Sequence, residues 1–165
     1  MLPTVAEQVH LYPGCAVSGC EGIAIILWTG EPTLAANQWA TRMLLARRGR
    51  PGADVTVLQI ITEDAGTPDS ETRAYIQEVY KRELSDVRRM VSAPLGNSFR
   101  QSVVRTILRG MALFAGKASN LTVVATLDDA YAAVLAGRSQ PRRAQLEAQV
   151  QAMLEASREG PRAPP

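Results

Sequence analysis

The apolar run from Asp54 to Ile61 constrains the fold of this chain more than any other segment. It contains Val55, Val57, Leu58, Ile60 and Ile61, so it is rich in β-branched residues and too apolar for a strand with one face in water. A strand of this kind is typical of the centre of a parallel sheet, where helices cover both faces. The rest of the chain must therefore supply neighbouring strands and the helices that connect them.

Apolar runs alternate with amphipathic stretches along residues 5–137. Strands are predicted at residues 9–12, 22–28, 54–61, 89–93 and 120–125, the first two paired with each other, and helices follow the last four strands. The order β-β-α-β-α-β-α-β-α implies parallel pairs with right-handed crossovers. The sequence thus predicts an α/β fold: a mixed, mostly parallel β-sheet with helices packed on it.

Several local signals mark the predicted helices. Ser98 with Gln101 has the pattern of a capping box, and Thr126 with Asp129 opens the last helix of the series. Trp39 lies on an apolar stripe at four-residue spacing in the first helix, so we expect it in the core. Pro94 must lie at the end of its strand or at a sheet edge, because it lacks the N–H that a ladder needs.

The composition changes after Gly137, so residues 1–137 are interpreted as one α/β domain and residues 138–165 as a basic tail. The tail ends in a proline-rich stretch, and its predicted helix has only a narrow stripe of Leu146, Val150 and Leu154. A single domain fits the length of 165 residues. We expect the tail to be dispensable for folding and to serve association.

Charge and hydropathy exclude several classes of protein. The formal net charge of +2 comes entirely from residues 138–165, which carry five Arg and three Glu, and the body is balanced. Nucleic-acid binding is not expected, because such proteins usually carry a basic stripe. No apolar run approaches the roughly 18 residues of a membrane span. A bacterial, cytoplasmic protein is the expectation.

The sequence offers few groups for catalysis or metal binding. His10 is the single histidine, and Cys15 and Cys20 have neither metal-ligand nor redox-motif spacing. Glycine-rich phosphate loops are absent from the sequence. We therefore predict no enzyme activity, no cofactor and no metal, with the two thiols buried as bystanders.

Candidate functional residues follow two of the predicted strands. Asp69, Ser70 and Arg73 connect the central strand to the second helix, and Ser98 and Arg100 open the third helix. In open parallel sheets, ligands and partners are commonly bound beyond the carboxyl ends of the strands. Ser70 has two interpretations: an N-cap, or a phosphorylation site beside Arg73.

Residues 9–136 resemble the STAS family of anti-sigma-factor antagonists, in particular its divergent STAS/SEC14-like members. The resemblance rests on the element order, on Ala93-Pro94-Leu95-Gly96-Asn97-Ser98-Phe99-Arg100 and on Val123-Val124-Ala125-Thr126-Leu127-Asp128-Asp129-Ala130. Phosphorylatable members carry Asp-Ser-Ser/Thr-Gly before the second helix. Asp69 and Ser70 match its first two positions, whereas Glu71 and Thr72 replace the compact turn.

The resemblance implies a non-catalytic module of bacterial signalling that binds another protein, such as a kinase, a sigma regulator or a transporter domain, as a monomer or a homodimer. Binding would involve the loop before the second helix and the start of the third. Two alternatives stay open: a SEC14-like carrier of a small apolar ligand, and a small transferase or hydrolase that uses Asp64, Asp69 or Ser70.

Overall fold

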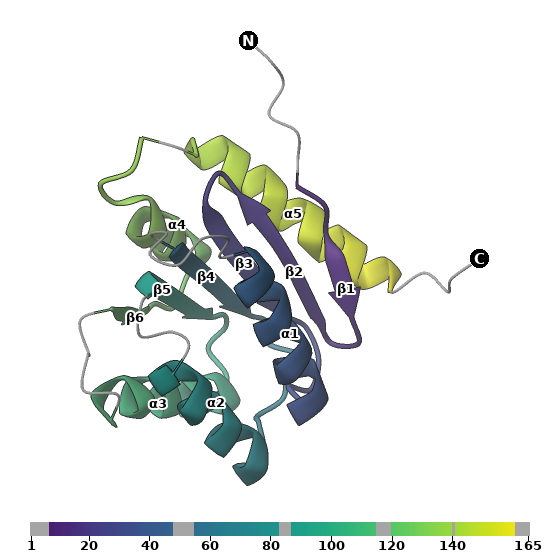
Figure 1. The fold of residues 1–165 in the computed structure, drawn as a ribbon, viewed down its shortest axis with the longest axis vertical. Coiled ribbons are helices and arrows are strands. Elements are labelled where there is room, and N and C mark those ends of the chain that lie inside the picture. Colours follow the sequence, from purple (N-terminus) through teal and green to yellow (C-terminus); the bar gives the residue numbers. More distant parts are fainter. Residues whose placement is uncertain (1–6, 48–54, 83–86, 115–119, 140, 161–165) are drawn as a thin grey trace.

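The structure, a computed structural model, describes residues 7–47, 55–82, 87–114, 120–139 and 141–160, with the backbone alone for residues 111–114. Its centre is one six-stranded sheet in the order β1-β2-β3-β4-β5-β6 (Figure 1). The strands are β1 (His10–Tyr12), β2 (Cys15–Cys20), β3 (Ile23–Trp28), β4 (Val55–Ile61), β5 (Val87–Pro94) and β6 (Leu121–Val123). β1, β2 and β3 are antiparallel neighbours, and β3 to β6 run parallel. The predicted α/β class with a mixed, mostly parallel sheet is confirmed.

The expected order omitted one strand, β2. The sequence Cys-Ala-Val-Ser-Gly-Cys is dominated by small residues and lacks the β-branched run that marks the other long strands. All six of its residues are nevertheless buried, because β2 lies between β1 and β3 and helices cover both of its faces. The observed order therefore begins β-β-β, and the strands predicted to pair directly each pair with β2 instead.

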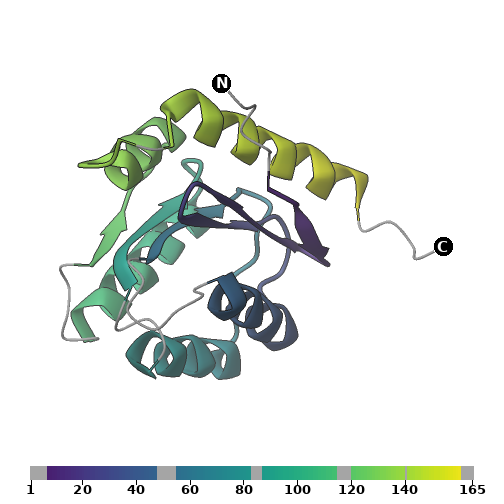
Figure 2. The same cartoon turned by 45° about the horizontal axis from the view of Figure 1, so that its top comes forward.

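Over the described ranges, five helices cover the sheet as two layers. They are α1 (Leu34–Arg47), α2 (Ser70–Arg82), α3 (Phe99–Phe114), α4 (Leu127–Leu135) and α5 (Arg143–Glu159). Figure 2 shows α4 and α5 on one side of the sheet and α1 and α2 on the other. Val104 and Leu108 place α3 on the side of α1, in one hydrophobic cluster with Ala36 and Ala40.

Helix α5 is part of the core. The expectation of a dispensable tail rests on the narrow apolar stripe of its predicted helix, and this argument is wrong. Leu146, Val150 and Met153 are fully buried against the sheet, in one cluster with strand residues such as Ile25 and Leu58. The predicted stripe named Leu154, which is only partly buried, in place of Met153.

A buried polar contact also connects α5 to the beginning of the chain. The amide nitrogen of Gln149 donates to Ser18 Oγ at 2.6 Å and to the carbonyl of Glu7 at 2.8 Å. Ser18 Oγ in turn donates to the carbonyl of Gln8 at 3.1 Å. The two ends of the described chain therefore depend on each other for hydrogen bonding.

Other local predictions had mixed outcomes. Pro94 is the last residue of β5, and Thr126 caps α4 by accepting from the backbone N–H of Asp129 at 3.1 Å, both as predicted. Trp39 is only partly buried, because the inner face of α1 is formed by Ala36, Ala40 and Leu44. Its ring instead stacks on Tyr12, with 5.3 Å between the ring centroids.

The packing of α5 predicts that Leu146→Ala destabilises the whole protein. Removing a fully buried leucine costs about 2–5 kcal/mol of unfolding free energy. Leu154→Ala, on the same helix but partly exposed, is the matched control and should cost about 1 kcal/mol. Urea unfolding measures both, and equal small losses would show that α5 is not part of the folding unit.

Candidate functional site

The loops after β4 and β5 lie together at the carboxyl edge of the sheet. The backbone N–H of Leu95 donates to the carbonyl of Ile61 at 2.8 Å, and the Gln101 side chain donates to the carbonyl of Thr62 at 2.9 Å. Gly96 has a φ of 94°, and an added Cβ there would collide with the side chain of Glu63. The two loops that the sequence predicts to share an edge therefore do share one.

Asp69, not Ser70, caps α2. The Asp69 carboxylate accepts the backbone N–H of Thr72 at 2.8 Å. This backbone hydrogen bond lowers the pKa of Asp69 below its ordinary value, and the positive charge of Arg73 acts in the same direction. Ser70 is the first residue of α2 and is exposed, so its hydroxyl is available to solvent and has no capping role.

The start of α3 presents both polar and apolar groups. Ser98 caps the helix by accepting the backbone N–H of Gln101 at 3.2 Å, while the Gln101 side chain reaches Thr62 instead of completing the capping box. Arg100 is exposed, and Phe99 is 86% exposed. Within the described residues, no hydrogen bond or ion pair links the start of α3 directly to that of α2.

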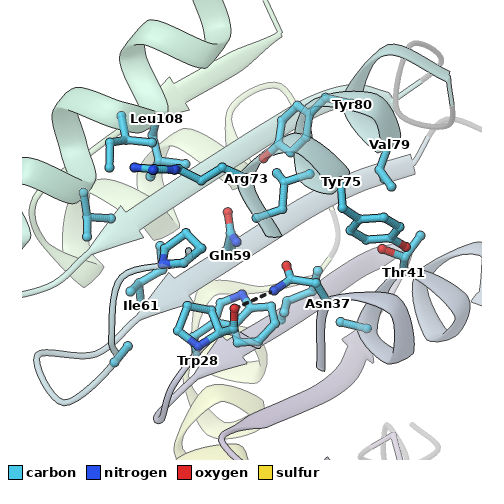
Figure 3. A pocket seen from close by; sticks show the side chains of 18 of the residues that line it. Trp28, Asn37, Thr41, Gln59, Ile61, Arg73, Tyr75, Val79, Tyr80 and Leu108 are labelled. Carbon is cyan, nitrogen blue, oxygen red and sulfur yellow. Dashed lines mark hydrogen bonds between the residues drawn. The ribbon is translucent and has the colours of Figure 1, made fainter. Parts of the chain in front are cut away.

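A cavity of about 100 Å³ lies between the sheet and the helices α1, α2 and α3. Sequence reasoning did not predict it. Most of its lining is apolar, and this part comes from all three helices and from the sheet: Ile26, Trp28, Leu44, Ile61, Ile76, Val79, Met90, Val104, Ile107 and Leu108. Figure 3 shows these walls facing one another across the space.

The cavity exists because α2 does not pack closely on the sheet. Thr72 is the one buried residue of this helix, and Ile76, Val79 and Tyr80 on its inner side are only partly buried. Helix α2 lies against α1 instead. Apart from Tyr80, which packs against the core, the apolar side of α2 therefore faces an open space where a tightly packed α/β protein would have side-chain contact.

Two amide side chains face the same space. Gln59 stands on the central strand β4, where its Oε1 accepts the hydroxyl of Ser92 at 2.8 Å and leaves its NH₂ group without a partner among the described residues. The Asn37 NH₂ group donates to the carbonyls of Thr33 and Pro32, at 2.9 and 3.2 Å. Its oxygen therefore points into the cavity (Figure 3).

The residues with potential for metal or redox chemistry lie elsewhere. Cys15 and Cys20 are free and buried, and they belong to clusters on opposite faces of the sheet. Burial raises the pKa of the two thiols to about 12 and about 11, so both stay protonated and unreactive near neutral pH. His10 lies on the short strand β1. Over the described ranges, no three His, Cys, Asp or Glu side chains gather as a metal site.

Comparison with known proteins gives no family for this chain. No protein-family model matches it, and neither does any curated protein. In the part of the chain that the structure describes, none of the helices is long and apolar enough to cross a bilayer.

The capping geometry predicts different effects for two neighbouring residues. Asp69→Ala should lower the thermal midpoint, and Ser70→Ala should leave it nearly unchanged, because only Asp69 accepts a free helix N–H. A lowered pKa in the folded state stabilises the protein above the unfolded pKa of about 3.8 and loses this effect as the pH falls through the folded value. The difference between parent and Asp69→Ala should therefore shrink below about pH 3.8. A larger loss for Ser70→Ala would assign the cap to the serine.

Proposed function

We propose that the protein is a non-catalytic binding module that holds a small apolar ligand in the cavity beneath α2. The cavity is the observation that carries this proposal, because an apolar space with a few convergent polar groups is the usual form of a ligand site. Gln59 and Asn37 supply such polar groups.

The volume limits the size of the ligand. An engineered apolar cavity of about 150 Å³ binds benzene, and the space here is about 100 Å³. The ligand body is therefore about one ring or a short alkyl chain, and a two-chain lipid is too large for this arrangement of α2. If the protein is a SEC14-like carrier, the cavity volume therefore limits its ligand to a small molecule.

A catalytic function has less support from the geometry. The Asp69 carboxylate is engaged in capping α2, and Ser70 has no hydrogen bond to a base among the described residues. A serine nucleophile needs a base within hydrogen-bonding distance. We therefore place binding ahead of a transferase or hydrolase that uses these residues or Asp64.

A second candidate function is association with another protein at the carboxyl edge, as in the STAS-like signalling modules that the sequence resembles. Phe99 favours it, since a phenylalanine 86% exposed beside Ser98 and Arg100 suits the apolar anchor of an interface. The loop with Asp69, Ser70 and Arg73 would complete that surface in a cytoplasmic partner complex.

The test of this second function is to measure the affinity of an identified partner for the parent and for Phe99→Ser. The affinity should fall about tenfold or more in Phe99→Ser, while Arg109→Ala, further along α3, should bind the partner as the parent does.

Cavity filling tests the ligand-binding proposal. Ala40→Leu on α1 adds apolar volume to the lining, so it should abolish binding of a neutral probe such as toluene and raise the unfolding free energy by about 0.5–2 kcal/mol. Ala46→Leu, at an exposed position of the same helix, is the matched control and should bind toluene as the parent does. Calorimetric titration measures the binding. A parent that takes up no toluene, or an Ala40→Leu variant that binds it equally well, would contradict the proposal.

A further inference from the structure

Arg73 is the one charged side chain among the described residues that line the cavity. It is an exposed residue of α2 that also borders the apolar space, so the cavity meets solvent beside it. Figure 3 shows its side chain extending across the cavity from α2 toward Leu108 of α3. The electrostatic character of the site is therefore set by one positive group at its margin.

No acidic group competes for this guanidinium within the cavity. Asp69 lies one helical turn before Arg73, and its carboxylate already accepts the backbone N–H of Thr72. The described residues give Arg73 no ion pair. The hydroxyl of Tyr80 stays protonated, because burial raises its pKa far above its ordinary value. The charge of Asp69 acts on Arg73 without forming an ion pair, so the guanidinium can still bind an anion from solution.

The remaining polar groups narrow the ligand further. Gln59 offers its free NH₂ group from the sheet, so donors reach the cavity from both the helix and the sheet side. The Asn37 oxygen is an acceptor, which would repel a second negative group on the ligand. The hydroxyl side chains of Thr41, Tyr75 and Tyr80 also line the cavity, and each can donate or accept. One carboxylate on an otherwise apolar body matches a single cation among these neutral polar groups.

Resting on the ligand-binding function proposed above, we propose that the ligand is a small monocarboxylate. Its apolar body, about one ring in size, lies between the sheet and α2, and its carboxylate binds the guanidinium of Arg73. The apolar walls contribute binding of the body, and Arg73 discriminates the acid from neutral molecules of the same shape. Selectivity for the charged group thus depends on a single side chain at the edge of the site.

The test compares acids with their neutral amides of nearly the same shape. The probes are benzoate, phenylacetate and hexanoate, each beside its primary amide, titrated calorimetrically into the full chain. The variants are Arg73→Gln, which removes the charge from the cavity, and Lys81→Gln, which removes one charge from an exposed position of the same helix. Thermal unfolding of each variant confirms that it folds.

We expect at least one acid to bind the parent about tenfold or more tightly than its amide, the factor expected for a charge-assisted hydrogen bond. Arg73→Gln should remove this preference and leave the amide affinity within about twofold, since the apolar contacts remain. Lys81→Gln should keep the preference.

Acids and amides that bind the parent equally, or an acid preference that survives Arg73→Gln, would overturn the monocarboxylate proposal and leave the ligand-binding function intact. Absence of binding by all six probes would overturn both.

Discussion

A glutamine side chain in the middle of a sheet face limits what can be packed over it. Gln59 lies on β4, the central strand, among the apolar residues of the face that α1, α2 and α3 cover. The Ser92 hydroxyl donates a hydrogen bond to the Gln59 oxygen, whereas the Gln59 NH₂ group has no partner among the described residues. An apolar helix packed directly on this group would bury an unsatisfied donor at a cost of about 1–3 kcal/mol. The position of α2 against α1, away from the sheet, avoids that cost and leaves the cavity open.

The two faces of the sheet therefore have different roles. On the side of α4 and α5, fully buried residues such as Val134, Leu146 and Met153 form a closed core, to which Gln149 and Ser18 add a satisfied polar contact. On the side of α1, α2 and α3, the core is complete near Ala36 but interrupted beneath α2, where Ala40 borders the cavity. Both faces thus carry a buried core, and the core under α1, α2 and α3 leaves a space unfilled.

Periodicity was sufficient for the class of fold and for most elements. The apolar run of β4 correctly predicted a central strand, and Pro94 correctly marked the end of β5. Strand β2 was missed because small residues give no clear periodic signal, and the role of α5 was missed because burial of Met153 and Gln149 depends on tertiary packing. Periodicity predicts which face of a helix is apolar, but it does not predict how far the helix lies from the sheet.

The candidate site shows the same limit. The loops after β4 and β5 share an edge, as the strand order predicted. Of Asp69, Ser70, Arg73, Ser98 and Arg100, however, only Arg73 lines the cavity, which depends on the spacing between α2 and the sheet. The one local clue was Gln59, a polar residue within an otherwise apolar strand. Its position could have indicated a ligand-facing surface, because an amide within a buried strand requires a partner.

The central claim is that the space between α2 and the sheet accepts an apolar ligand, and methyl NMR tests it most directly. Protein labelled at Ile, Leu and Val methyl groups is titrated with toluene, and each resonance is followed. The account predicts saturable shifts, with one common dissociation constant, for Ile76, Val104 and Leu108, which line the cavity, and unchanged resonances for Val134 and Leu146 in the opposite core. Unchanged cavity methyls at saturating toluene, or equal shifts on both faces, would contradict it.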